Sequence, residues 1–188
     1  MRFKRRFNQK YKETPDVFGR APMPILEKAV KIIPAGNALE LGVGSGRNAL
    51  YLLDKGFKVT GVDMSKEGIR LLREKFSDES KLELVVKDVT KFDTKNKFDL
   101  VCAIGLLHFL DIKNIKSLVQ KMKGFTKPGG INVIGAKMTQ NLREDLPHVF
   151  KENELKEIYE EGNWKIVHYK EISRSRGKVA TLIAKKTQ

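Results

Sequence analysis

The chain has 188 residues, of which 40% are hydrophobic and 32% are charged, and this favours one domain with a single core. Its 37 basic and 23 acidic residues leave a net charge of +14, which favours anionic partners or substrates but indicates no fold. A single cysteine, Cys102, excludes a disulfide framework and any zinc site built from several cysteines. Every apolar run is shorter than the roughly 18 residues of a membrane span, and the N-terminus lacks a secretory signal. The sequence therefore predicts a soluble, cytoplasmic protein with no membrane partner.

The positive charge is concentrated at the two ends of the chain. Residues 1–20 hold seven basic and two acidic side chains, a surplus of +5, and residues 165–188 hold seven and one, a surplus of +6. The rest of the chain carries only +3 of the +14. If the two ends meet in space, they form one electropositive rim suited to an anion or a nucleic-acid backbone. The alternative is a lysine-rich, solvated surface.

Predicted strands and helices alternate along the first two thirds of the chain. The apolar run 38–43 ends in a glycine-rich turn, and residues 47–55 then show the apolar spacing of a helix. A second strand, 57–63, precedes a helix that Ser65 can cap. The later elements are strands at 82–86, 98–104 and 131–136, with a helix at about 113–124. This alternation predicts a parallel sheet.

The last third of the chain has a different pattern. A polar loop at 137–150 leads to a predicted helix at 152–161. Two β-rich segments, 164–172 and 179–184, follow closely enough to form an antiparallel hairpin. The predicted fold class is therefore α/β, a Rossmann-like doubly wound sheet that is mostly parallel with a C-terminal antiparallel hairpin. We expect residues 1–30 to form a lead-in that covers the ligand site, and residues 31–188 to form one domain.

The most informative stretch is Glu40-Leu41-Gly42-Val43-Gly44-Ser45-Gly46-Arg47, where the first strand passes into the first helix. Glycines there let the backbone turn tightly and let a ligand approach it closely beside a helix N-terminus. The dinucleotide fingerprint G-x-G-x-x-G is absent because its last position is Arg47, and the P-loop ending G-K-S/T is absent as well. In a doubly wound sheet this edge is the expected ligand crevice.

Two acids follow the next two strands at the same edge of the sheet. Asp63 ends the second strand, 17 positions after Gly46, where a carboxylate can accept hydrogen bonds from both hydroxyls of a ribose. Asp88 follows the third strand and can accept from the amino group of an adenine. Either acid alone is more commonly a helix cap, but both acids together with the glycine turn indicate a nucleoside ligand.

The segment ELGVGSGRNALYLLDKGFKVTGVDMS resembles the cofactor-binding half of class I S-adenosylmethionine-dependent methyltransferases, and FTKPGG resembles the turn before their fifth strand. More narrowly, residues 38–186 resemble the tellurite-resistance methyltransferase family of TehB type. That resemblance is carried by GRN with LYLLDKGF, by LLHFLDIKNIKSLVQKMKGFTKPGG and by HVFKENELKEIYE. It implies a seven-stranded class I methyltransferase fold, S-adenosyl-L-methionine as cofactor, S-adenosyl-L-homocysteine as product, and no metal.

The resemblance also implies roles for individual residues. Glu40 would sit near the methionine amino group, Asp63 would hold the ribose, and Met64 would pack against the adenine face. Met64 and Val89 equally suit ordinary core positions. Tyr11 and the Phe18-Gly19-Arg20 segment resemble the lead-in that covers the cofactor in related enzymes. The full set of implied cofactor contacts is Glu40, Gly42, Gly44, Gly46, Asp63, Met64, Asp88, Val89 and Ile104.

Candidates for orienting the methyl acceptor follow the fourth and fifth strands and the terminal hairpin. They are His108, Arg143 and Arg174, with His148, Arg176 and Lys178 as further polar side chains nearby. His108 stands among apolar residues, where a packed histidine is the commoner outcome. In the family, anion recognition is attributed to basic and histidine residues at the hairpin. The hairpin here, ISRSRGKV, is shorter and has no histidine.

Three hypotheses for function follow from these residues. The first is methyl transfer to a small, soft or anionic acceptor, such as a thiol or a metalloid oxyanion like tellurite or selenite. The second is an RNA or protein methyltransferase that uses its basic surface, although Ala103-Ile104-Gly105-Leu106 lacks the Asn/Asp-Pro-Pro-aromatic signature of base-amino methylation. The third is a non-catalytic nucleic-acid-binding protein, which the intact glycine turn and both acids argue against. The partner favoured here is a small molecule, and no oligomeric state is predicted.

Overall fold

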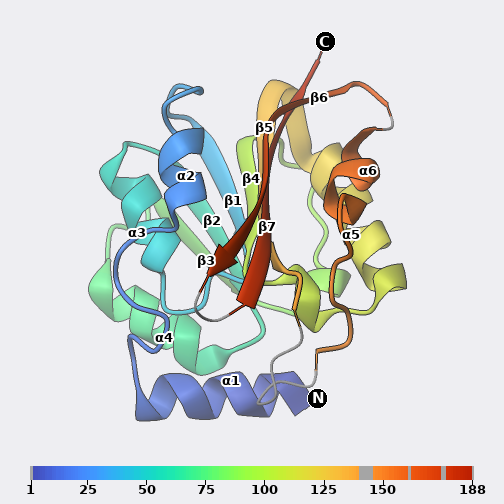
Figure 1. The fold of residues 1–188 in the computed structure, drawn as a ribbon. Coiled ribbons are helices and arrows are strands. Elements are labelled where there is room, and N and C mark those ends of the chain that lie inside the picture. The colour runs from blue at the N-terminus through green and yellow to red at the C-terminus, as the bar shows by residue number, and fades with distance from the viewer. Residues whose placement is uncertain (1, 140–145, 161, 175–176, 188) are drawn as a thin grey trace.

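A seven-stranded sheet forms the centre of the molecule (Figure 1). The computed structural model describes residues 2–139, 146–160, 162–174 and 177–187. The strand order is β3-β2-β1-β4-β5-β7-β6, and only β7 is antiparallel to its neighbours. The strands are β1 (Asn37–Leu41), β2 (Lys58–Asp63), β3 (Leu82–Val86), β4 (Phe98–Ile104), β5 (Thr126–Lys137), β6 (Trp164–Arg174) and β7 (Gly177–Lys186). The predicted fold class, a mostly parallel doubly wound sheet with a C-terminal antiparallel hairpin, is confirmed.

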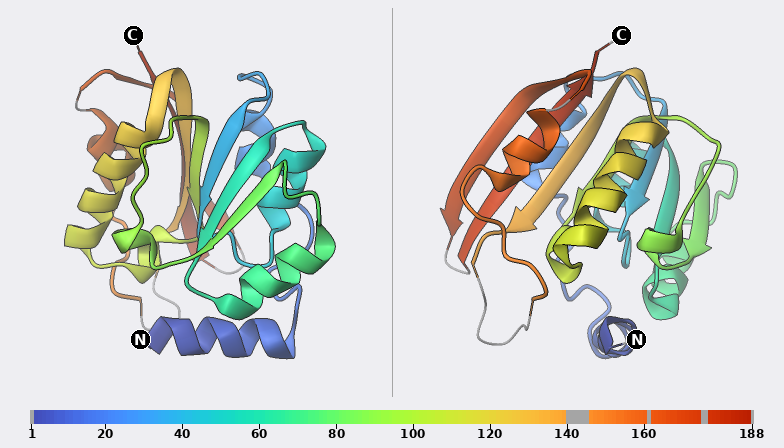
Figure 2. Two further views of the ribbon diagram at one scale, coloured as in Figure 1. Left: turned by 180° about the vertical axis from the view of Figure 1, so that it is seen from behind. Right: turned by 90° about the vertical axis from the view of Figure 1, so that its right-hand side faces the viewer.

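Helices cover both faces of the sheet (Figure 2). One face packs against α2 (Pro24–Ala29), α3 (Arg47–Asp54) and α4 (Lys66–Lys75), through buried side chains such as Leu26, Leu52 and Leu72. The other face packs against α5 (Ile112–Phe125) and α6 (Glu154–Glu160), through Leu118 and Tyr159 among others. Two short 3-10 helices, η1 (Val89–Lys91) and η2 (Leu107–Phe109), follow β3 and β4. The central strands are buried on both faces, which explains their nearly continuous apolar sequences.

Local capping fixes where two of these helices begin. The Ser65 hydroxyl accepts from the Gly68 amide at 3.1 Å at the start of α4, as predicted. Asp111 accepts from the Asn114 amide at 2.8 Å at the start of α5. The fifth strand is longer than predicted, because it already begins at Thr126, before the glycine pair. Its pairing with β4 shifts register between Phe98 and Leu100, which accommodates the extra residues.

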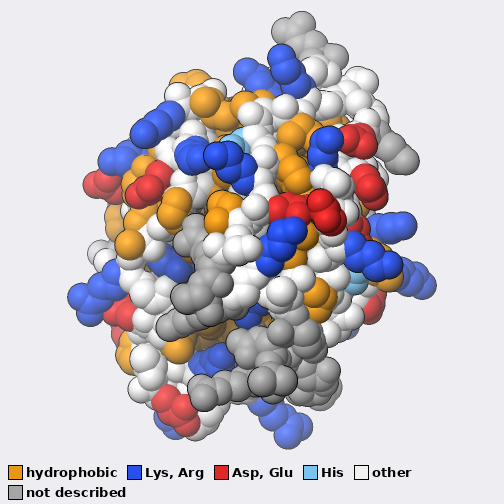
Figure 3. Space-filling model, in the orientation of Figure 1, with side chains coloured by type: hydrophobic (Ala, Val, Ile, Leu, Met, Phe, Trp, Pro, Cys, Tyr) orange, Lys and Arg blue, Asp and Glu red, His pale blue; other side chains and the backbone are white. Residues whose placement is uncertain are grey.

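The two ends of the chain lie on opposite sides of the molecule (Figure 1). Helix α1 (Arg2–Glu13) lies across the edge where the parallel strands end, and the C-terminus lies at the opposite end of the molecule (Figure 1). The reason is that β7 runs antiparallel and carries the chain away from that edge. Figure 3 shows Lys and Arg side chains scattered over one face among acidic and hydrophobic ones. The basic residues of the C-terminal segment are therefore divided: Lys178 lies beside the end of β5 at the ligand edge, whereas Lys185 lies at the other end of the hairpin.

Within the described ranges, every helix is too short or too polar to cross a membrane.

Candidate active site

The glycine turn after β1 is closed by backbone hydrogen bonds and by tight packing. The amides of Gly42 and Val43 donate to the Val62 carbonyl at 2.8 and 3.1 Å, which fixes the turn against the end of β2. Gly46 has a φ of 90°, and a Cβ there would lie 2.2 Å from the Leu72 side chain of α4. A Cβ on Gly44, whose φ is 56°, would lie 2.2 Å from the Tyr11 hydroxyl oxygen. Both positions therefore require glycine for backbone conformation and for space.

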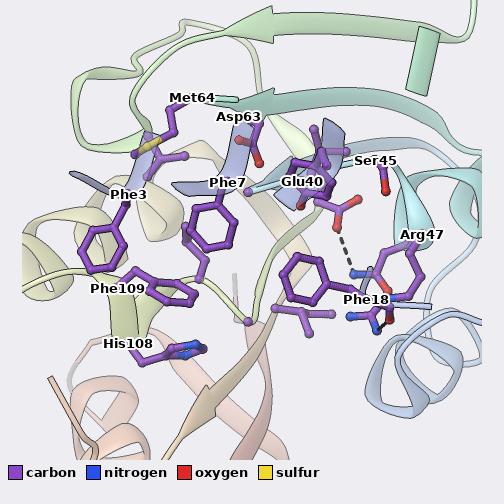
Figure 4. A pocket seen from close by; sticks show the side chains of 18 of the residues that line it. Phe3, Phe7, Phe18, Glu40, Ser45, Arg47, Asp63, Met64, His108 and Phe109 are labelled. Atoms are coloured by element: carbon purple, nitrogen blue, oxygen red, sulfur yellow. Dashed lines mark hydrogen bonds between the residues drawn. The ribbon is translucent and has the colours of Figure 1, made fainter. Parts of the chain in front are cut away.

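A cavity of about 220 Å³ opens above this turn, at the ends of β1, β2 and β4 (Figure 4). Its floor carries Glu40, Gly42, Val43, Ser45, Arg47, Asn48, Asp63, Met64, Val89, Ile104, Gly105 and Leu106. Its cover carries Phe3, Phe7 and Tyr11 of α1, and Phe18. The remaining wall carries His108, Phe109, Leu110 and Lys137. Residues far apart in the sequence therefore meet at the sheet edge where ligands bind in doubly wound folds.

Glu40 is the most deeply buried charged group of the cavity, with 2% of its surface exposed. Its Oε1 accepts from the Asn48 side-chain amide at 3.0 Å, and Asn48 is itself held because its Oδ1 accepts from the Met23 amide at 3.0 Å. The other oxygen, Oε2, is buried with no hydrogen-bond partner among the described residues. Burial raises the pKa of Glu40 to about 8, against the opposing effects of Asn48 and Arg47. A cationic donor placed at Oε2 would satisfy this oxygen and favour the ionised form.

Asp63 joins the glycine turn to the start of α4. Its Oδ2 accepts from the Gly44 amide at 2.9 Å, and its Oδ1 accepts from the Ser65 amide at 2.7 Å. Burial raises the pKa of this carboxyl, and the backbone hydrogen bonds oppose that shift. Each carboxylate oxygen has a second lone-pair direction, so Asp63 can still accept from two hydroxyls of a ligand in the cavity.

Helix α1 and the segment after it are tied to the floor by polar contacts. The Asn8 Oδ1 accepts from the Ser65 hydroxyl at 2.8 Å and from the Glu67 amide at 3.2 Å. The Arg47 guanidinium lines the cavity and donates to the Phe18 carbonyl at 2.6 Å. Burial lowers the pKa of Arg47 and raises the pKa of Tyr11. Side chains of the N-terminal segment and of the floor therefore both help to position helix α1 over the glycine turn.

The structure brings most of the sequence-predicted residues to one cavity, but not all of them. Those that line it are Glu40, Gly42, Asp63, Met64, Val89, Ile104 and His108. Gly44 and Gly46 lie in the turn outside the cavity lining. Asp88 is also outside it, and its Oδ1 accepts from the amide and hydroxyl of Thr90, at 3.0 and 2.8 Å, and caps η1. The cofactor contacts of these residues stay predictions.

The predicted acceptor-side residues are placed less completely. Arg143 and Arg176 lie outside the described residues, and Arg174 ends β6 with its side chain outside the described part. His148 forms a contact of 2.9 Å between its Nε2 and Glu154 Oε1, and Lys178 pairs with Glu171 at 2.7 Å. Among the three candidates for orienting the acceptor, His108 alone is placed in the cavity lining by the described residues.

Several cavity residues were not predicted as site residues from the sequence. Phe3 and Phe7 stand four residues apart, and with Tyr11 they form one face of α1. This four-residue spacing of aromatic residues is the sequence pattern that could have identified the covering face of α1. Asn48 follows Arg47 in the turn motif, and Lys137 ends β5 at the ligand edge. Phe109 had no local signal, because only the fold shows that η2 faces α1.

The strand order, the glycine turn after β1 and the acid ending β2 together define the class I methyltransferase fold. The sequence pattern of the family described as "Tellurite resistance protein TehB" matches residues 2–179, and the chain belongs to this family.

Individual relatives agree with that membership. The "Probable S-adenosyl-L-methionine-dependent methyltransferase TehB" of Haemophilus influenzae is 32% identical over 173 residues, covering 84% of this chain and 60% of that protein. The crystal structure of TehB from Haemophilus influenzae superimposes with a TM-score of 0.78 at 29% identity, covering 98% of this chain and 67% of that one. The N-methyltransferase NodS from Bradyrhizobium japonicum WM9, solved with S-adenosyl-L-homocysteine, superimposes with a TM-score of 0.75 at 19% identity. The match covers 87% of this chain and 84% of that one, and it shows the shared fold alone. The chain spans about 60% of the length of the curated relatives it matches first.

Proposed function

We propose that this chain is an S-adenosyl-L-methionine-dependent methyltransferase that methylates a small, soft or anionic acceptor, such as a thiol, tellurite or selenite. The observation that carries the proposal is the Glu40 Oε2 atom, which is buried in the cavity floor without a partner in the described part of the chain. A buried carboxylate oxygen of this kind fits an ammonium group. Family membership and the name of the Haemophilus influenzae relative support the same activity.

The residues of the floor fit this cofactor. Glu40 would hold its amino group, Asp63 would hold its ribose hydroxyls, and Gly42 would lie against it without a Cβ in the way. Met64 and Val89 line the same cavity and would pack against the adenine. When bound, the cofactor supplies a methyl group on a positively charged sulfur, so the acceptor's lone pair forms the new bond while the old C–S pair stays on sulfur.

The chain's own contribution is to hold and dehydrate the reactants. A soft, ionised nucleophile needs no strong base, so orientation and exclusion of water supply much of the acceleration. Residues 1–30 serve as the cover of the site and residues 31–188 as the methyltransferase domain. Three contacts support the covering role: Tyr11 against Gly44, Asn8 on Ser65, and Arg47 on Phe18.

RNA or protein methylation remains as an alternative that the charge of +14 motivates. We therefore include total RNA and protein as acceptors in the test and keep the small-molecule proposal.

Calorimetry with S-adenosyl-L-homocysteine tests the cofactor site. We expect micromolar or tighter binding to the wild type, and a loss of about tenfold or more in Glu40→Gln, because an amide gives the ammonium no charge-assisted bond. Glu79→Gln, at an exposed position, is the matched control and should bind like the wild type. Equal affinity in both variants would refute the assigned role of Glu40.

Transfer of a labelled methyl group tests the acceptor. The panel contains thiols, selenite, tellurite, arsenite, total RNA and protein. Labelling of a small molecule supports the proposal, and labelling of RNA or protein alone would overturn it.

A further inference from the structure

The segment 14–20, here called the strap, follows α1 and covers one end of the cavity. The Phe18 side chain of the strap lines the cavity, and the Phe18 carbonyl accepts from the Arg47 guanidinium at 2.6 Å. Figure 4 shows Phe18 beside Arg47, on the Glu40 side of the cavity. The strap therefore lies over the end of the cavity where Glu40 would hold the amino group of the cofactor.

Lys75, in the last turn of α4, joins the strap to the floor. Its Nζ atom donates to Asp16 Oδ1 of the strap at 2.7 Å and to the Ser45 carbonyl of the glycine turn at 3.2 Å. The Lys75 and Asp16 side chains are 30% and 25% exposed, so water and salt screen this ion pair less than a fully exposed one. Lys75 itself lies outside the cavity lining. One ammonium group therefore bridges the cover and the glycine turn without lining the cavity.

The Asp16 carboxylate is held by a cation at each of its oxygens. Its Oδ2 accepts from the Arg20 Nε at 2.7 Å, within the strap, while its Oδ1 accepts from Lys75. The hydrogen bonds from Lys75 and Arg20 lower the pKa of the Asp16 carboxyl. Asp16 is therefore ionised at neutral pH, and the ion pair with Lys75 is formed under the conditions of a binding measurement.

Helix α4 holds the two parts of the cover at its opposite ends. At its N-terminal end, the Asn8 Oδ1 of α1 accepts from the Ser65 hydroxyl, and the Ser65 amide donates to Asp63. At its C-terminal end, Lys75 holds the strap. The cover is thus attached separately near Asp63 and near the glycine turn. A change at Lys75 should release the strap while α1 keeps its own attachment.

Resting on the proposed methyl transfer, we propose that Lys75 is a positioning residue that holds the strap over the amino-acid end of the bound cofactor. Lys75 acts through Asp16 and touches neither the cofactor nor the acceptor. The strap it holds keeps water away from Glu40, and the bond between this carboxylate and the cofactor's ammonium is stronger where water is excluded. The adenosine end of the cofactor depends on Asp63 and α1 and not on Lys75.

Calorimetry with two ligands tests this difference between the ends. S-Adenosyl-L-homocysteine has the amino-acid end, and 5′-methylthioadenosine keeps the adenosine and the sulfur but lacks that end. Lys75→Met should weaken S-adenosyl-L-homocysteine about three- to tenfold, which is the range of one partly exposed ion pair with its hydrogen bonds. The same variant should change 5′-methylthioadenosine affinity by less than about twofold. An equal loss for both ligands, or no loss for either, would overturn the proposal.

The matched control is Lys127→Met. Lys127 pairs with Asp99 at 2.9 Å, the two side chains are 39% and 27% exposed, and Asp99 lies near the start of β4, at the end of the sheet away from the cavity. Loss of this ion pair should leave both affinities at the wild-type value. A selective loss of S-adenosyl-L-homocysteine binding in Lys127→Met would show that any such ion pair has the same effect.

Two further variants show whether Lys75 acts through the strap. Lys75→Arg keeps the charge and the donors, so it should recover most of the affinity that Lys75→Met loses. Asp16→Asn combined with Lys75→Met should lose little more than Lys75→Met alone, because both changes break the same contact. Fully additive losses would refute the coupling. Hydrogen exchange gives an independent measure: the cofactor product should slow exchange of the strap amides of Val17 and Gly19 more in the wild type than in Lys75→Met.

The outcomes also separate this inference from the proposed function. If the wild type binds neither ligand, the proposed function is wrong. If the wild type binds S-adenosyl-L-homocysteine and Lys75→Met binds it equally well, only the role of Lys75 is wrong.

Discussion

The floor and the cover of the cavity are built in different ways. The floor is part of the sheet: Glu40 stands in β1, Asp63 ends β2, and backbone hydrogen bonds from Gly42 to Val62 hold the turn between them. The cover is a separate helix whose contacts with the floor run through the side chains of Asn8 and Tyr11. A site with a rigid half and a separable half can hold one ligand firmly while its other half admits a second ligand.

A large effect on the free energy of unfolding should come from a substitution in the glycine turn of the floor. Gly46→Ala forces a side chain into a left-handed conformation and against Leu72, so the free energy of unfolding should fall by about 2–4 kcal/mol. Urea unfolding measures this. Gly124→Ala, in α5 with nothing within 4 Å of the added Cβ, is the control and should be neutral or slightly stabilising. Equal stability of the two variants would show that the turn tolerates a side chain.

A substitution of Asp63 tests whether its carboxylate binds the ligand in the cavity. Asp63→Ala should weaken S-adenosyl-L-homocysteine binding by about 1–3 kcal/mol, because charge-assisted hydrogen bonds are lost. Asp88→Ala should cost less, about 0.5–1.5 kcal/mol, since Asp88 lies outside the cavity lining. Calorimetry on both variants shows which one loses more affinity for S-adenosyl-L-homocysteine. A wild-type affinity for Asp63→Ala would contradict the ribose assignment.

Deleting the cover should show that it contributes to cofactor affinity but is not needed for folding of the floor. Deletion of residues 1–20 should leave a cooperatively unfolding core, because both core clusters begin after this segment. Affinity for S-adenosyl-L-homocysteine should fall at least about tenfold, or about 1.4 kcal/mol, because Tyr11 and Phe7 no longer exclude water. Unchanged affinity by calorimetry would show that the helix is no lid. A milder variant, Asn8→Ala, should weaken binding in the same direction.

A further prediction concerns how the free energy of unfolding depends on pH. Burial raises the pKa of Glu40 from 4.5 to about 8, so between pH 5 and 8 the folded state holds a proton that the unfolded chain has released. The stability contributed by protonated Glu40 is therefore present at pH 5 and declines as the pH rises through 8. In urea unfolding followed from pH 5 to 8, Glu40→Gln should make the free energy of unfolding decline less with rising pH than in the wild type. Carboxyls with a lowered pKa, such as Glu171 at about 2, titrate below this window.

The same titration gives a signature of binding. An ammonium at Glu40 favours the ionised carboxyl, so S-adenosyl-L-homocysteine should displace a proton near pH 7. Calorimetry in buffers of different ionisation enthalpy counts this proton, and Glu40→Gln should release none there.

Much of the floor was predictable because its signals are local. Glu40 and Asp63 stand beside a glycine turn and at a strand end, so the pattern of a few residues fixes their edge of the sheet. Asp88 follows β3 at the same edge, but it lies outside the cavity lining, and its role at the adenine stays a prediction. Sequence spacing gives the position of such an acid but not the direction of its side chain.

The cover was predictable only in outline. The sequence placed a covering segment within residues 1–30, and Tyr11 lies over the turn. The contact between Phe7 and Phe109 joins residues that are a hundred positions apart, and no local pattern reveals it. The extra length of β5 was missed because a proline and two glycines normally end a strand.

The direction of β7 has a practical consequence for handling the protein. Because this strand carries the chain end to the far side of the molecule, a purification tag or a fused reporter attached after Lys186 stays remote from the cavity. Attached before α1, the same addition adjoins Phe3 in the cavity wall and would interfere with ligand entry. Assays of ligand affinity should therefore use C-terminal fusions.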